Sequence, residues 1–146
     1  MPIIEEAKAD TLSIYSMLYL IKKGVMPPEQ RKSVMVAFLS YTLRASRYGV
    51  HEAHGLGGVV EFNWMMKHEA FLYDGKTGKY KIDFDKFEKA ITSLAAEFLE
   101  IEATGDYDRA KKLFEDYGKI PDHLVKNIEL LKDLPEDILP IYDVRM

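Results

Sequence analysis

The chain has 146 residues, of which 47% are hydrophobic and 30% charged, and its formal net charge is −4. This length predicts a single domain, residues 1–146, large enough to bury a core. The acidic balance argues against a general nucleic-acid binder, which would carry a basic face. The absence of cysteine excludes disulfides and thiolate metal sites. No apolar run approaches the ~20 residues of a membrane span, and no apolar signal region opens the sequence, so we expect a soluble cytoplasmic protein without membrane partners.

Helical periodicity dominates the first part of the chain. Residues 3–25 predict a helix with an apolar stripe, which ends at Gly24 and a pair of prolines. Acids gather near its start, where the helix dipole favours negative charge. A second helix is predicted over residues 29–48 and is ended by Gly49.

A third helix is predicted over residues 50–67, although three glycines fall within residues 55–58. Each glycine costs roughly 1 kcal/mol in a helix relative to alanine. We therefore expect a packed helix or a bound ligand to press against the backbone at this point. In this helix His51 and His54 would share a face, with Glu61 on the same side.

From residue 71 onward the period of the sequence changes. Two short alternating runs around Asp74-Gly75 and Thr77-Gly78 predict a β-hairpin over residues 71–82, which must pack on the helices to be stable. Asp83 is a candidate N-cap for a fourth helix that reaches about residue 103.

Two shorter helices complete the predicted fold, over residues 105–117 and 121–132. The tail from residue 133 contains two prolines, and we expect it to run extended over the surface. The predicted fold class is therefore mainly α, with about six helices in a bundle and one small β-hairpin.

The residues with candidate chemistry form a cluster of acids near the N-terminus and a cluster of histidines farther along the chain. The members are Glu5, Glu6 and Asp10 in the first and His51, Glu52 and His54 in the second. Two imidazoles at i, i+3 can reach one metal ion, but HxxH occurs often by chance and the zinc motif HExxH is absent. Phosphate-loop, GxSxG and CxxC motifs are absent too. The acids taken alone are better explained as a complement to the helix dipole, and whether the two clusters meet stays open.

Several segments, taken together and in order, resemble the dipeptidyl-peptidase III family of zinc metallopeptidases. EEAKAD at residues 5–10 resembles the family motif of an acidic pair, a small residue, a basic residue, alanine and a closing acid. Residues 44–71 are similar to the downstream region of the shorter bacterial members. The hairpin, DYDRAKKLFEDYG at residues 106–118 and LPEDILPIY at residues 134–142 also fit. The resemblance covers nearly the whole chain.

This resemblance implies roles for three residues. Glu6 matches the glutamate that serves as the third zinc ligand, and Asp10 matches the acid that supports a zinc-bound histidine. His54 matches the histidine that stabilises the tetrahedral oxyanion. No role carries over to the remaining candidates, which we treat as pocket-lining residues: Glu5, His51 and Glu52.

The chain also departs from the family pattern. The HExxGH motif, which supplies two histidine ligands and the general-base glutamate, lies upstream of the acidic motif in the family and has no counterpart here. Catalytic zinc needs three protein ligands and a water molecule. The resemblance therefore implies the C-terminal part of a catalytic region that is inactive alone. Zinc and a peptide substrate belong to the complete enzyme, and this chain by itself is expected to bind zinc weakly or not at all.

Without the upstream HExxGH segment, a face that normally meets the rest of the peptidase would be exposed. Such a patch commonly finds a partner, so we expect self-association as a homodimer. The alternative function is a non-catalytic helical domain that binds a partner or itself and holds no metal, with the N-terminal acids acting only as a capping cluster.

Overall fold

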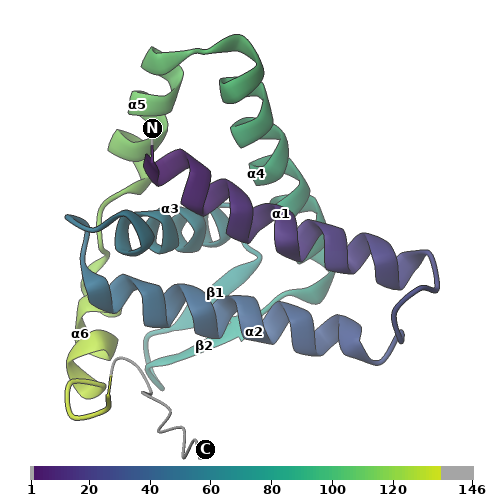
Figure 1. The fold of residues 1–146 in the computed structure, drawn as a ribbon. Helices are drawn as coiled ribbons and strands as arrows, with labels where there is room; N and C mark the ends of the chain where they lie inside the picture. The colour runs from purple at the N-terminus through teal and green to yellow at the C-terminus, as the bar shows by residue number, and fades with distance from the viewer. Residues whose placement is uncertain (1, 136–146) are drawn as a thin grey trace, which may run out of the picture.

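The computed structural model describes residues 2–135, which form six α-helices, a short 3-10 helix and one antiparallel hairpin (Figure 1). The elements are α1 (Pro2–Lys22), α2 (Gln30–Ala45), η1 (Ser46–Tyr48), α3 (Ala53–Lys67), β1 (Phe71–Asp74), β2 (Lys79–Ile82), α4 (Phe84–Thr104), α5 (Tyr107–Tyr117) and α6 (Asp122–Leu130). The predicted class, mainly α with one hairpin, is confirmed. Most of the tail that was expected to run extended, residues 136–146, lies outside the described residues.

Helix α3 packs against α1, α2, α4 and α5 and is the centre of the arrangement (Figure 1). Its glycines explain how close these contacts become. A Cβ added at Gly57 would lie 3.3 Å from the Cβ of Ala7 on α1, and one at Gly58 would lie 2.6 Å from the Cβ of Ala45 on α2. At Gly57 and Gly58, packed helices are therefore what presses against the backbone.

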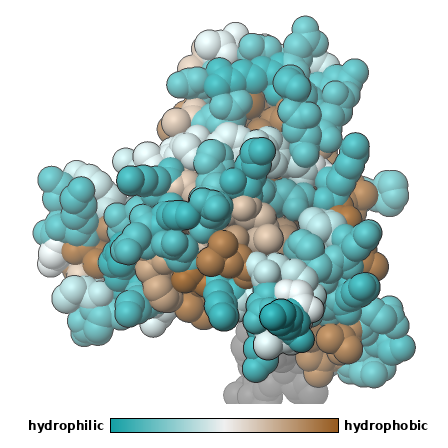
Figure 2. Space-filling model, turned by 180° about the vertical axis from the view of Figure 1, so that it is seen from behind, coloured by the Kyte–Doolittle hydropathy of each residue, from teal (hydrophilic) through white to brown (hydrophobic). Residues whose placement is uncertain are grey.

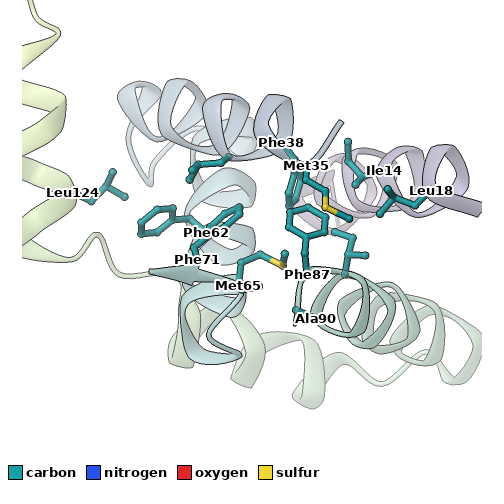
Figure 3. Close-up of a cluster of buried hydrophobic side chains, with 13 residues drawn as sticks. Ile14, Leu18, Met35, Phe38, Phe62, Met65, Phe71, Phe87, Ala90 and Leu124 are labelled. Atoms are coloured by element: carbon teal, nitrogen blue, oxygen red, sulfur yellow. The ribbon is translucent and has the colours of Figure 1, made fainter. Parts of the chain in front are cut away.

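The main core cluster joins residues from six elements around the rings of four phenylalanines (Figure 3). Phe38 of α2 meets Phe87 of α4 edge to face, with ring centroids 6.0 Å apart, and Phe62 of α3 meets Phe71 of β1 at the same separation. Large buried rings dominate core energetics. Phe62 and Phe71 are both fully buried.

A second core cluster lies where the start of α1 meets α3, α4 and α5. Its buried members are Ile4, Ala7, Val60, Leu94, Phe98, Ile101, Ala110 and Leu113. This cluster fixes the N-terminal turns of α1 against α3, so it positions the acids on α1.

The hairpin is stabilised by contacts with α6. Its strands pair Phe71 with Ile82 and Tyr73 with Tyr80. The ring of Tyr73 stacks on His123 of α6 with centroids 4.5 Å apart, and the Tyr80 hydroxyl lies 2.9 Å from His123 Nδ1. A two-stranded hairpin alone is marginal in water, and this packing supplies the missing support.

Helix α3 begins later than the sequence pattern predicted. Glu52 has an extended backbone and is the N-cap, and its carboxylate accepts a hydrogen bond from the Gly55 amide at 3.0 Å. His51 therefore lies in the preceding turn. The expectation that His51 and His54 share a helical face is wrong, because the cap starts the helix between them.

The surface of the described residues carries both hydrophilic and hydrophobic side chains. In the view of Figure 2, hydrophilic side chains cover most of the face, and hydrophobic side chains show in small groups. Among residues 2–135, no helix combines the length and the apolar character that crossing a membrane requires.

We predict that Gly58→Ala destabilises the fold by about 1–3 kcal/mol, because the new methyl group overlaps the Cβ of Ala45, which cannot rotate away. Urea unfolding followed by circular dichroism measures this change. Gly75→Ala is the matched control, since a Cβ there meets nothing closer than 3.9 Å. Equal stability of the two variants would show that α2 can move away from α3 at little cost.

Candidate functional site

The structure brings the acidic cluster and one histidine together where α1 crosses the start of α3. His54 Nδ1 lies 3.5 Å from Glu6 Oε2, which is within ion-pair distance when the imidazole is protonated. The side chains of His54 and Glu6 are 51% and 44% exposed, so both can meet a group outside this chain. The sequence pattern left open whether the two clusters meet, and these two residues do.

Asp10 lies one turn farther along α1 and is half-buried between α1 and α2. Its Oδ2 accepts a hydrogen bond from the hydroxyl of Tyr41 on α2. Burial raises the pKa of the Asp10 carboxyl, and the nearby Glu6 raises it further, while the Tyr41 hydrogen bond and the charge of His54 oppose this shift. The hydrogen bond from Tyr41 therefore fixes the Asp10 carboxylate beneath the exposed pair of Glu6 and His54.

Glu61 of α3 lies deeper still and is fully buried. Its Oε1 accepts a hydrogen bond from Thr11 Oγ1 at 3.1 Å, and its Oε2 has no partner among residues 2–135. Burial, and then the charge of Asp10, raise the pKa of Glu61 well above its usual value. Burial beside this neighbour therefore favours the neutral form of the Glu61 carboxyl.

The expected position of Glu61 on the same side of α3 as His54 is confirmed, because both side chains contact α1. The seven-residue spacing of these two positions places them two turns apart on one face. The contact of His54 with Glu6 is polar and half-exposed, and the contact of Glu61 with Thr11 is buried. This face of α3 therefore lines the candidate site opposite α1.

The three remaining candidates lie elsewhere. Glu5 pairs with Lys8 at 2.7 Å and lines a separate surface pocket with Ile101 and Tyr107. Glu52 caps α3, and His51 is exposed in the turn before it. None of these placements adds a group to the pair of Glu6 and His54.

The described residues supply too few donors for a complete zinc site. Within residues 2–135, no group of three or more His, Cys, Asp or Glu side chains is placed to hold a metal ion. The Glu6 carboxylate is half-exposed and has the Asp10 carboxylate one turn away, so it fits one ligand of a zinc site with a supporting acid behind it. The donor set fits a zinc site that is completed by residues of another segment.

Three residues of the site were missed as functional candidates: Thr11, Tyr41 and Glu61. Thr11 is buried on α1, and Tyr41 of α2 packs partly buried against the main core cluster. A polar side chain in a stripe of buried positions must find a hydrogen-bond partner, and this requirement is the signal that could have found them.

Comparisons with known proteins support the family resemblance that the sequence suggested. No family model matches the chain. Dipeptidyl-peptidase III from Caldithrix abyssi superposes with a TM-score of 0.92 and 39% identity over 97% of this chain. The enzyme from Corallococcus sp. strain EGB superposes with a TM-score of 0.90 and 31% identity over 96% of this chain. In sequence and in fold, the chain matches part of dipeptidyl-peptidase III. The family resemblance found in the sequence is confirmed.

A further relative is Nudix hydrolase 3 from Arabidopsis thaliana, which is 35% identical over 142 residues. That match covers 95% of this chain and 18% of the plant protein. The chain likewise spans 27% and 26% of the two dipeptidyl-peptidase III chains. Most of each relative lies outside the matched part, so their names describe proteins several times longer than this chain.

Proposed function

We propose that the chain is the C-terminal portion of a zinc-dependent dipeptidyl-peptidase III-like metallopeptidase. In this function it supplies the third zinc ligand, Glu6, and an oxyanion-stabilising histidine, His54. The observation that carries the proposal is the 3.5 Å contact between Glu6 and His54. The family resemblance assigns a role to each of these residues separately, and the contact joins them at one accessible site.

Each residue of the site has a role suited to its position. When bound, zinc polarises a carbonyl group and activates water. Glu6 would hold the metal with a carboxylate oxygen. Asp10, held by Tyr41, would accept a hydrogen bond from an imidazole ligand and fix its orientation.

His54 is placed to stabilise negative charge on the substrate. It is the second residue of α3, where the helix dipole adds positive potential. In peptide hydrolysis, water attacks the scissile carbonyl and its oxygen gains negative charge. An imidazole that donates a hydrogen bond to this oxygen lowers the barrier.

The remaining parts of the catalytic centre belong to an upstream segment. Two histidine ligands and a general base from HExxGH would complete the coordination. The solved relatives are about four times as long as this chain, which leaves room for that segment. We therefore propose that the chain is inactive alone and acts on peptides only with this partner segment. Homodimer formation and a cytoplasmic location remain predictions.

A chimera tests the proposed function. In it, this chain replaces the matched segment of the Caldithrix abyssi enzyme. We expect zinc-dependent release of dipeptides from a peptide substrate, and we expect Glu6→Ala to abolish it because one of three protein ligands is lost. Glu5→Ala is the control, since that side chain pairs with Lys8 instead.

Activity that survives Glu6→Ala would contradict the proposal. If Glu6→Ala only lowers stability by about 1 kcal/mol, as for a charge near a helix end, the acids form a capping cluster and the alternative of a metal-free binding domain is favoured.

A further inference from the structure

The buried polar groups beneath the candidate site form a connected set that the family resemblance does not assign. Tyr41 contributes from α2, Thr11 from α1 and Glu61 from α3. Asp10 lies one helical turn from Glu6 on α1, and the charges of Glu6 and His54 act on it. The Asp10 carboxylate of α1 is therefore bonded from α2, and the adjacent Thr11 is bonded to Glu61 of α3.

The geometry assigns Tyr41 and Glu61 the role of positioning residues for the Asp10 carboxylate. Tyr41 bonds one oxygen of Asp10 from α2, and Glu61 lies fully buried on α3, bonded to the neighbouring Thr11. Together they direct the charge of Asp10 toward Glu6 and His54. The role of this orientation in metal binding depends on the proposed function, whereas the orientation itself does not.

The contact from Tyr41 is suited to holding a carboxylate. A hydroxyl that donates to an ionised oxygen forms a charge-assisted hydrogen bond, which is stronger than a neutral one. Burial and the neighbouring Asp10 raise the pKa of the Tyr41 hydroxyl, so it stays a donor. Because Tyr41 bonds Oδ2, Oδ1 remains available for a second partner.

Glu61 is an unfavourable residue for its position unless its proton is retained. An ionised carboxylate in a fully buried site is costly, and here it would also repel Asp10. Protonated, it fills the space, accepts from Thr11 and adds no second negative charge. Glutamine has the same shape and is always neutral, so it can replace glutamate in this role.

Among residues 2–135, the titratable groups whose charges interact with Asp10 come from these same three helices. They are Tyr41 from α2, Glu61 and His54 from α3, and Glu6 from α1. Loss of the Tyr41 donor leaves burial and Glu6 to raise the Asp10 pKa with only His54 opposing them. The Tyr41→Phe variant should therefore hold Asp10 less firmly and protonate it at higher pH.

Carbonyl-carbon NMR of the Asp10 side chain in this chain tests the role without any metal. In Tyr41→Phe we expect a higher Asp10 pKa and averaging of its side-chain couplings over several rotamers. In Glu61→Gln we expect the native Asp10 couplings, because the neutral isostere preserves the positioning. Tyr15→Phe is the control, since Tyr15 is exposed and lines a groove against α4.

An unchanged Asp10 signal in Tyr41→Phe would overturn the proposal, and so would disordered Asp10 couplings in Glu61→Gln. In the chimera, Tyr41→Phe should weaken zinc affinity by about 10–100-fold, as loss of outer-shell support does. Unweakened zinc binding in that variant, in a chimera that still needs Glu6, would overturn the link between positioning and metal. If Glu6→Ala also leaves zinc binding intact, the proposed function fails, and the NMR result still decides the positioning of Asp10.

Discussion

His54→Ala in the chimeric enzyme is expected to lower kcat by about 10²–10³-fold with little change in zinc affinity, the usual cost of removing one oxyanion donor. The imidazole contacts Glu6 at 3.5 Å, yet in the proposed function it donates to substrate oxygen and not to the metal. Steady-state kinetics on a dipeptide-releasing substrate, with zinc affinity measured in parallel, checks both parts of this expectation.

The matched control for this variant is His51→Ala. His51 lies three positions earlier but in the exposed turn before α3, outside the contact with Glu6. We expect near-native kinetics for it. An equal loss in both variants, or a loss of zinc that accompanies the loss of kcat in His54→Ala, would contradict the assigned role.

Glu61→Gln is expected to change how stability depends on pH. The folded-state pKa of Glu61 is raised, so its contribution to stability is fully present below the ordinary glutamate pKa and is lost as pH rises through the folded value. Within that window the native protein should lose up to about 1.4 kcal/mol per pH unit from this group. Glu61→Gln keeps an acceptor for Thr11 and should lose none of it.

Urea unfolding of both proteins across that pH window measures the difference. The two stabilities should lie close together in acid, and the variant should become the more stable protein as pH rises. Glu29→Gln is the control, because Glu29 is exposed and makes no side-chain cap bond. If the stability of the native protein and of Glu61→Gln changed with pH in the same way, the folded-state pKa of Glu61 would not be raised.

Local signals in the sequence predicted most of the elements. Asp83 accepts from the amides of Asp85 and Lys86 and starts α4, as its place before an apolar stripe indicated. Asp106 caps α5 in the same way. These caps depend only on residues two or three positions away, so they can be predicted from the sequence. The start of α3 was predicted too early, because a turn occupies the residues before its cap, Glu52.

The candidate site depends on contacts that local patterns do not contain. Glu6 and His54 were proposed from the family resemblance, and their meeting requires α1 to cross α3 closely where Gly57 faces Ala7. Tyr41 enters from a third helix, so its sequence position indicates that it needs a hydrogen-bond partner but not that the partner is Asp10. Buried partners of this kind follow from long-range packing, which a single sequence does not show.

The central claim is that this chain contributes one zinc ligand to a site that another segment completes. Zinc titration calorimetry on the isolated chain and on the chimera, each with and without Glu6→Ala, tests it most directly. We predict weak or absent binding by the isolated chain, and tight one-to-one binding by the chimera that Glu6→Ala removes. Tight one-to-one binding by the isolated chain, lost in both Glu6→Ala and His54→Ala, would contradict the account, because the chain would then form a complete site of its own.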